Sequence, residues 1–288
     1  MKYISKIIYF FLKIINYVFE KIFSRNILVW IKFLIEEDSY KKIKLKSGKE
    51  LIFFSPNFLI YKLIKDFYVK EPETLEWIDN FKISEKIIFW DIGSNIGLYS
   101  IYAAVNFKNI EVISFEPSTS NLRVLSRNIS INNLENKIKI FQIPLGISSN
   151  KFLEFNERKF SEGESHNSLD KNIDFEGKKL DPNNKYQIFS TNIDQIINDK
   201  ILEIPNYIKI DVDGIEHLIL KGGLNLLKSP KILEIQIEIN ENYFDQYNSV
   251  LKIMDECMFK FREKKRNDTS NYYLDKNFSK IYNYYFSR

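Results

Sequence analysis

The sequence predicts an α/β fold of the Rossmann-like type, with a mostly parallel sheet flanked by helices. Short Ile-rich runs alternate with helical patterns from residue 87 onward, which is typical of βαβ units. The runs are uniformly apolar, as expected of strands covered by helices on both faces. A Gly-containing turn follows the first run. The predicted strands are residues 87–90, 112–115, 138–143, 207–210 and 232–239.

The chain divides into three predicted parts. Residues 1–40 form an apolar and basic helical extension, residues 41–85 a lead-in hairpin and helix, and residues 86–288 the α/β domain. The hairpin turns at Ser47-Gly48-Lys49, and Pro72 lies near the start of a helix predicted over 67–81.

Two further features are predicted within the α/β domain. The polar stretch of about residues 148–190 is predicted to be an inserted hairpin and loop that shapes a substrate pocket. At the carboxyl end, residues 258–262 and 271–274 flank a polar turn and are predicted to form an antiparallel pair.

The first 35 residues are rich in Ile, Phe, Tyr and Leu but carry regularly spaced charges. Their longest uncharged run, residues 7–12, is far shorter than the roughly 20 residues of a membrane-spanning helix, and no small-residue cleavage site follows. Lys6, Lys13 and Lys21 recur near two-turn spacing, which favours an amphipathic helix on an anionic membrane surface. The alternative is a helix packed on the domain or on a partner subunit.

Composition limits the class of partner and the compartment. The 42 basic and 38 acidic side chains nearly balance, which gives no electrostatic case for a nucleic-acid partner. Cys257 is the single cysteine, so no intramolecular disulfide forms, and with only His166 and His217 there is no zinc-type ligand set. We expect a cytoplasmic protein with peripheral contact on the inner membrane face; the oligomeric state stays open.

The most informative stretch is Asp91-Ile92-Gly93-Ser94-Asn95-Ile96-Gly97, which follows the first predicted strand. Gly93 lets the backbone approach a ligand closely, and Gly97 lets the next helix pack tightly on the strand. A dinucleotide loop has the form Gly-x-Gly-x-x-Gly, because a pyrophosphate binds at the helix N-terminus. Here Asp91 would repel a pyrophosphate, whereas a cationic sulfonium ligand with an ammonium group is favoured.

The second predicted strand ends in Phe115-Glu116-Pro117. Rossmann-type proteins place a ribose-binding carboxylate at this distance beyond the loop, and such a carboxylate accepts hydrogen bonds from both ribose hydroxyls. The predicted cofactor-binding residues are Asp91, Gly93, Asn95, Gly97 and Glu116.

Residues 67 to 239 resemble FkbM-type methyltransferases. The resemblance is carried by the motifs at residues 71–74, 91–97, 115–117, 210–216 and 220–222. It implies a seven-stranded class I methyltransferase core with S-adenosylmethionine as methyl donor. The first 60 residues and the carboxyl tail lie outside the resemblance. In the hypothesis of such a cofactor site, Asn95 reaches the methionine portion. By family analogy, the acceptor is a hydroxyl on a sugar, glycolipid or secondary-metabolite glycan, and His166 lies near the substrate side.

Asp211, Asp213, Glu216 and His217 gather where the fourth core strand meets its helix. The family's usual motif there is Asp-Val-Glu-Gly, so Asp213 is a shorter carboxylate than the resemblance implies. Methyl transfer to a hydroxyl needs an in-line acceptor and a proton acceptor, and Asp211 or His217 is the predicted base. In the alternative, Asp213 caps a helix that begins near Gly214, and His217 points away from the ligand.

A second version has these carboxylates, with Glu238, hold Mg²⁺ that lowers the pKa of the acceptor hydroxyl. A calcium loop is excluded, because its third acidic ligand position and distal Glu are missing. Phe58 and Tyr61 are further candidates for the acceptor pocket.

The sequence disfavours two other function classes. A nicotinamide-dependent oxidoreductase would need a pyrophosphate loop with a third Gly, which the sequence lacks. A non-catalytic scaffold that docks through its N-terminal helix would be favoured by loss of the loop residues, yet Asp91, Gly93, Gly97 and Glu116 are all present.

Overall fold

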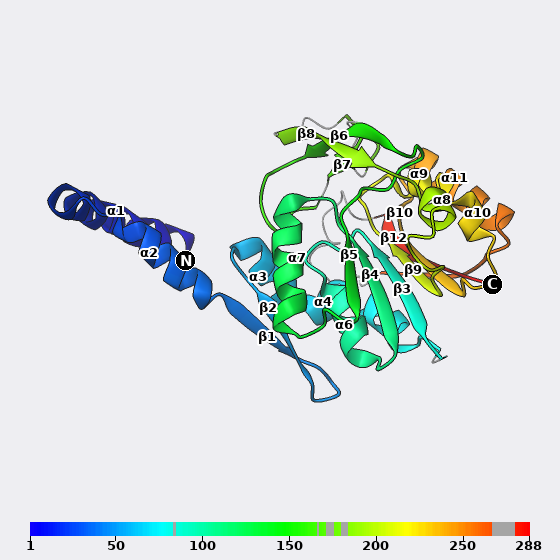
Figure 1. Cartoon of the computed structure of the whole chain (residues 1–288), viewed down its shortest axis with the longest axis horizontal. Coiled ribbons are helices and arrows are strands. Elements are labelled where there is room, and N and C mark those ends of the chain that lie inside the picture. The colour runs from blue at the N-terminus through cyan, green and yellow to red at the C-terminus, as the bar shows by residue number, and fades with distance from the viewer. Residues whose placement is uncertain (83–84, 166, 171–175, 180–183, 267–279) are drawn as a thin grey trace.

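A seven-stranded sheet forms the centre of the molecule in the computed structural model (Figure 1), which describes residues 1–82, 85–165, 167–170, 176–179, 184–266 and 280–288. The strand order is β11-β12-β10-β9-β3-β4-β5, and β12 is antiparallel to both of its neighbours. This order confirms the predicted mostly parallel sheet of a class I methyltransferase core. The strands are β3 Ile87–Ile92, β4 Ile110–Phe115, β5 Ile138–Phe141, β9 Tyr207–Ile210, β10 Glu234–Asn240, β11 Lys260–Lys265 and β12 Ile281–Ser287.

Helices cover both faces of the sheet, which explains why its strands are apolar throughout. Successive residues of β3 enter different cores: Ile87 and Phe89 pack with one set of helices, Ile88 and Trp90 with the other. The first set is α5 Pro72–Asp79, α6 Leu98–Asn106 and α7 Thr119–Ile131. The second set is α8 Ile193–Asn198, α9 Glu216–Lys221, α10 Leu224–Leu227 and α11 Phe244–Glu256.

The lead-in segment contains the expected hairpin but divides the expected helix. Strands β1 Tyr40–Lys44 and β2 Glu50–Phe54 pair antiparallel, with Gly48 at positive φ in the turn. In place of one helix over 67–81, the chain forms α4 Phe67–Lys70 and α5, and a further helix, α3 Phe58–Lys65, precedes them. Pro72 starts α5 because proline suits the first helical position and lacks the N–H that would continue α4.

The insertion is a small three-stranded sheet rather than a simple hairpin. Strands β6 Lys151–Glu157, β7 Ser168–Leu169 and β8 Asn184–Ser190 pair antiparallel in the order β7-β6-β8. They lie beyond the carboxyl ends of β4 and β5 in Figure 1. Leu153, Phe155 and Leu169 pack against Ile215 and Leu218, which fixes the insertion over that edge of the main sheet.

The carboxyl-terminal pair differs in its second strand. Strand β11 overlaps the predicted segment 258–262, but its partner β12 begins at Ile281. The predicted second segment, 271–274, lies outside the described residues. Strand β12 enters the sheet between β10 and β11 and completes it.

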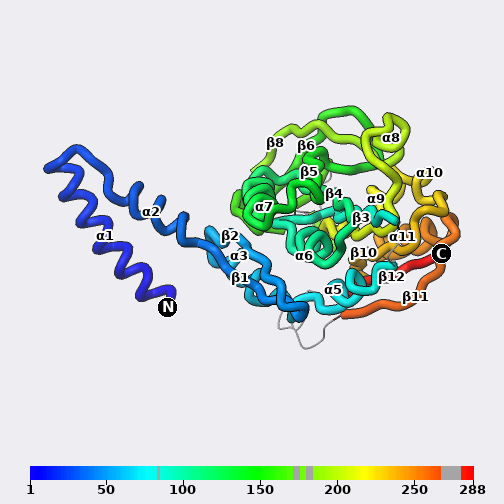
Figure 2. Tube along the Cα trace, turned by 60° about the horizontal axis from the view of Figure 1, so that its bottom comes forward, coloured from blue at the N-terminus to red at the C-terminus, as the bar shows by residue number. Residues whose placement is uncertain are grey.

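Two helices, α1 Lys2–Phe23 and α2 Ile27–Glu37, form an antiparallel hairpin that projects from the domain (Figures 1 and 2). Asn16 of α1 is buried and accepts a hydrogen bond from the Leu28 N–H at 3.0 Å, which helps to satisfy the first turn of α2. Within the described parts of the chain, no helix has both the length and the apolarity needed to cross a membrane.

Candidate active site

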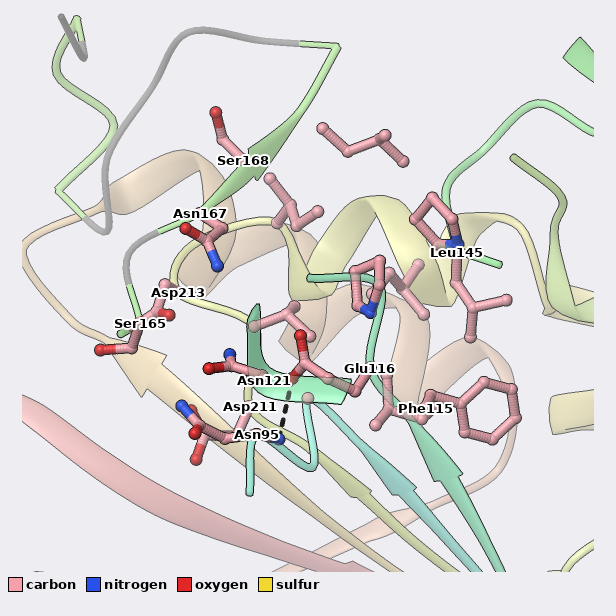
Figure 3. Close-up of a pocket in the computed structure, with 18 of the residues that line it drawn as sticks. Asn95, Phe115, Glu116, Asn121, Leu145, Ser165, Asn167, Ser168, Asp211 and Asp213 are labelled. Atoms are coloured by element: carbon pink, nitrogen blue, oxygen red, sulfur yellow. Dashed lines mark hydrogen bonds between the residues drawn. The ribbon is translucent and has the colours of Figure 1, made fainter. Parts of the chain in front are cut away.

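One pocket opens at the carboxyl ends of β3, β4, β9 and β10 (Figure 3). Its floor includes Gly93 and Asn95 after β3, Glu116 after β4 and Asp211 after β9. Residues 164–165 and 167–169 of the insertion line the opposite side. Open α/β sheets bind ligands at this edge, where parallel strands end and helices begin.

Gly93 is required by the close approach of the loop after β3 to β9. Its φ is 84°, and a Cβ atom at this position would lie 1.9 Å from the backbone oxygen of Asp211. The N–H groups of Gly93 and Ser94 both donate to the Phe115 carbonyl at 3.0 Å. The loop is therefore fixed between the ends of β4 and β9.

Gly97 has a different neighbour from the one predicted. Its φ is 85°, and an added Cβ would lie 2.5 Å from Leu125 Cδ1 of α7. Gly97 thus allows α6 to begin close to α7 rather than close to the strand. It is not among the residues that line the pocket.

Asp91 lies beneath the loop and is fully buried. Its Oδ2 accepts a hydrogen bond from Ser100 Oγ at 2.5 Å, and Ser114 Oγ lies 2.7 Å from Ser100 Oγ. Burial raises the pKa of Asp91, against the opposing charge of Lys209. Asp91 supports the loop from below and does not line the pocket, so its predicted cofactor contact stays a prediction.

Glu116 is held at the end of β4 with its carboxylate facing the pocket. Oε2 accepts from the Asn95 N–H at 2.8 Å, the bond drawn in Figure 3, and Oε1 accepts from the Ser118 N–H at 2.9 Å. Burial raises the pKa of Glu116 to about 7. A carboxylate oxygen accepts more than one hydrogen bond, so this fixed group can still receive hydroxyl donors.

Amide side chains hold the insertion over the pocket. Asn95 Nδ2 donates to the carbonyls of Gly163 and Glu164, at 3.4 and 3.3 Å. Asn121 of α7 binds the same turn twice, accepting from the Gly163 N–H at 2.8 Å and donating to the Glu164 carbonyl at 3.1 Å. Sequence reasoning missed Asn121, because no spacing rule relates α7 to an insertion 42 residues further on.

A cluster of carboxylates lines the pocket beside β9 and β10. One oxygen each of Asp211, Asp213 and Glu238 lies within 4.8 Å of the others. Lys209, only 1% exposed, places its Nζ 2.7 Å from Asp211 Oδ2. A lysine ammonium thus already supplies positive charge next to this cluster.

The pKa values of Asp211 and Glu238 in this cluster are shifted in opposite directions. Burial opposes ionisation of Asp211, but the Lys209 ammonium, with Lys70 further away, outweighs it and holds the pKa of Asp211 below its ordinary value. Burial and the charge of Asp211 together raise the pKa of Glu238 well above its ordinary value. Asp211 therefore ionises more readily than Glu238, the division expected of two adjacent carboxyl groups of which one has a cationic partner.

Glu216 and His217 face away from the pocket, although both are adjacent to it in sequence. The fully buried Glu216 carboxylate accepts from the Val212 N–H at 3.0 Å and the Gly214 N–H at 3.1 Å, and also from Gln246. His217 is buried, with its ring edge-to-face with Tyr243 at 5.8 Å between centroids. The base role predicted for His217 stays a prediction that this placement does not favour.

Asp213 does not cap the following helix. Helix α9 begins at Glu216 with Ile215 as its N-cap residue, and Asp213 lies in the preceding turn with φ of 58°. Its carboxylate belongs to the pocket lining instead. The carboxylate of Glu216 satisfies the backbone of this turn, the role that sequence reasoning gave to Asp213.

The remaining predicted residues lie elsewhere. Phe58 and Tyr61 stack on each other on α3, 6.2 Å between ring centroids, and neither lines the pocket. His166 lies outside the described residues. The inserted loop around His166, a further predicted contributor to the acceptor pocket, does line it, through Glu164, Ser165, Asn167 and Ser168. Lys70 is a lining residue that sequence reasoning missed.

Comparison with known proteins identifies the family. The model of the methyltransferase FkbM domain matches residues 91–261, more than half of the chain. The chain belongs to the FkbM methyltransferase family. Methyltransferase sdnD of Sordaria araneosa is 30% identical over 92 residues, which cover 32% of this chain and 36% of that protein. The chain thus matches about a third of the length of this curated relative.

Solved structures of similar fold include two methyltransferases. FkbM from Methylobacillus flagellatus KT aligns with a TM-score of 0.44 at 18% identity, over 72% of this chain and 45% of that one. TrmK from M. capricolum, in complex with S-adenosyl-homocysteine, aligns with a TM-score of 0.41 at 13% identity, over 74% and 66% of the two chains.

The family implies S-adenosylmethionine as the methyl donor, and the pocket fits such a ligand. Asn95 Oδ1, Asn167 Oδ1 and Ser168 Oγ are buried without hydrogen-bond partners among the described residues, and all three residues line the pocket. Apolar walls stand beside them, formed by Phe115, Ile143, Leu145 and Phe155. Polar and apolar linings together suit a nucleoside that carries an amino acid. The comparisons give no comparable support for Mg²⁺.

Proposed function

We propose that the chain transfers the methyl group of S-adenosylmethionine to a hydroxyl of a sugar, glycolipid or secondary-metabolite glycan. One observation carries the proposal: the ionised Asp211 lines the same pocket as Gly93 and Glu116. A proton acceptor next to a cofactor loop is what methyl transfer to a hydroxyl requires.

The residues of the loop side would bind the cofactor. Glu116 would accept hydrogen bonds from the ribose hydroxyls, and the buried oxygen of Asn95 would receive a donor from the methionine portion. When bound, S-adenosylmethionine supplies an electrophilic methyl group on a sulfonium. The turn at residues 163–164, held by Asn95 and Asn121, would keep water from this side of the pocket.

The residues of the β9 side would act on the acceptor. Asp211 would accept the hydrogen bond of the acceptor hydroxyl and take its proton as the methyl group is transferred. Lys209 fixes the Asp211 carboxylate at 2.7 Å, and Glu238 stands beside it. The polar side chains of Lys70 and Asp213, with Ser165 on the insertion opposite, suit an acceptor that carries several hydroxyl groups.

Isothermal titration with S-adenosylhomocysteine, with NAD in a parallel cell, tests the cofactor assignment. We expect S-adenosylhomocysteine to bind with a Kd of about micromolar order and NAD not to bind. NAD binding would replace the proposal with an oxidoreductase. If folded protein binds neither compound, the scaffold interpretation is favoured instead.

Transfer of a labelled methyl group to a panel of glycans and glycolipids tests the acceptor class, and Asp211→Asn tests the base. With an accepted substrate, we expect Asp211→Asn to lower kcat by at least about a hundredfold, with S-adenosylhomocysteine affinity within about threefold of the parent. Asp255→Asn is the matched control, because Asp255 is exposed on α11. An unchanged kcat in Asp211→Asn would remove Asp211 from the reaction.

A further inference from the structure

We propose that the α1–α2 hairpin docks the chain on an anionic membrane surface, with one face of α1 entering the lipid interface. The proposal does not depend on the proposed reaction, because it concerns a surface that lies away from the pocket (Figure 2). Its evidence is the distribution of apolar and basic side chains on the hairpin.

One continuous apolar stripe follows the length of α1. Its members recur at spacings of three or four residues, and each is between 46% and 65% exposed. A helix of 22 residues is about 33 Å long, so this stripe is far larger than the scattered apolar residues of an ordinary surface. The stripe consists of Ile4, Ile7, Ile8, Phe11, Ile14, Ile15, Val18 and Ile22.

The stripe does not face α2. Helix α1 meets α2 along a different side, where Asn16 is buried and Leu12 and Phe19 are half-buried. The hairpin joins the domain at its other end, where Glu36 of α2 forms ion pairs with Arg123 and Arg127 of α7. Within the part of the chain that the structure describes, the stripe therefore lies open.

The hairpin also carries the positive charge of the chain. Residues 2–37 contain six basic side chains and three acidic ones, Glu20, Glu36 and Glu37. Taking these from the totals of 42 and 38 leaves 36 basic and 35 acidic side chains, so the rest of the chain is nearly neutral. At 3.6 residues per turn, Lys21 borders the stripe, and Lys6 and Lys13 lie on the polar side of α1 away from it. The positive charge of all three would be attracted to an anionic lipid surface.

Charge favours a membrane over a second copy of the chain as the occupant. A second hairpin would bring an equal net positive charge close to this one, and like charges repel. An anionic lipid surface attracts the lysines and accepts the apolar stripe together. Helix α2 adds the exposed aromatic residues Trp30 and Phe33, a residue class enriched at membrane interfaces.

Cosedimentation of the full chain with vesicles tests the proposal. We compare vesicles of phosphatidylcholine alone with vesicles that also contain phosphatidylglycerol, and expect strong binding to the second kind. Phe11→Gln removes an aromatic side chain from the stripe, and Tyr9→Gln removes one from the polar side at similar exposure, 58% and 53%. We expect Phe11→Gln to weaken binding at least about tenfold and Tyr9→Gln less than about threefold.

A variant with fewer lysines separates the electrostatic contribution to vesicle binding from the apolar one. Lys6→Gln with Lys13→Gln should weaken binding to the anionic vesicles at least about tenfold and leave the small binding to neutral vesicles unchanged. Far-UV circular dichroism confirms that each variant keeps its helices. The proposal is overturned if the parent chain does not bind anionic vesicles, or if Phe11→Gln and Tyr9→Gln weaken binding equally. It is also overturned if light scattering shows a dimer that Phe11→Gln dissociates while vesicle binding is unchanged.

Discussion

Replacement of Lys209 by methionine tests the electrostatic account of the site. Lys209 is buried in β9, with its Nζ 2.7 Å from Asp211 Oδ2 and 5.1 Å from the centre of the Tyr99 ring. Lys209→Met keeps most of the side-chain volume but leaves the Asp211 carboxylate without its ammonium partner. Breaking a buried ion pair from one side costs about 3–5 kcal/mol, so we expect a loss of this size in the free energy of unfolding at pH 8.

The pH dependence of the loss follows from the two pKa shifts. The pKa of Asp211 is lowered, so its contribution is present above its unfolded value of 3.8 and disappears as pH falls through the folded value. The pKa of Lys209 is raised, so its contribution is present below 10.5 and disappears at higher pH. Without Lys209, burial raises the pKa of Asp211. The deficit of Lys209→Met should therefore be smaller at pH 5 than at pH 8.

Urea unfolding followed by circular dichroism measures these free energies. Adding Asp211→Asn to Lys209→Met removes the unpaired charge, and we expect the double variant to regain about 2 kcal/mol at pH 8. A loss below about 1 kcal/mol for Lys209→Met, or a double variant no more stable than the single one, would refute this account of the pair.

Two further predictions concern the cofactor loop. Gly93→Ala should lower the free energy of unfolding by about 2 kcal/mol more than the control Gly48→Ala, because both glycines have positive φ but only Gly93 contacts another backbone; equal losses in thermal unfolding would contradict this. S-adenosylhomocysteine should bind more weakly as pH falls from 8 to 6, because the pKa of Glu116 is about 7 and its protonated form accepts fewer hydrogen bonds. Titration of Glu116→Gln should show no such dependence, and a dependence that persists would have another source.

The sheet could be predicted where local sequence decides burial. Strands β3, β4 and β9 are apolar runs with both faces covered, and each observed strand lies within two residues of its predicted bounds. The carboxyl-terminal pair could not be predicted in the same way. The aromatic composition of residues 281–287 is shared with other segments of the tail, so composition did not identify them as β12; their pairing with β10 and β11 does.

The site could be predicted where the loop itself sets the geometry. Gly93 and Glu116 follow from spacing, since the ends of neighbouring parallel strands meet at one edge. Glu216 is close to Asp211 in sequence, and this proximity wrongly suggested that it belongs to the site. Its carboxylate points into the protein and accepts hydrogen bonds from the backbone of the preceding turn. Lys209 was missed because its partner Asp211 lies just beyond the end of the same strand, and Asn121 because its partner lies in an insertion. Neither contact produces a periodic pattern in the sequence.

Arg123 of α7 lies between the hairpin and the cover of the pocket. It forms an ion pair with Glu36 at the end of α2 and another, at 3.0 Å, with Glu162 in the turn that covers the pocket. Arg123 is 46% exposed, and exposed pairs of this kind contribute about 0–1 kcal/mol. Such a link is too weak to drive closure of the pocket, but it fixes where the hairpin joins the domain. Docking on a membrane would therefore not alter the chemistry of the pocket, so loss of vesicle binding should leave affinity for S-adenosylhomocysteine intact.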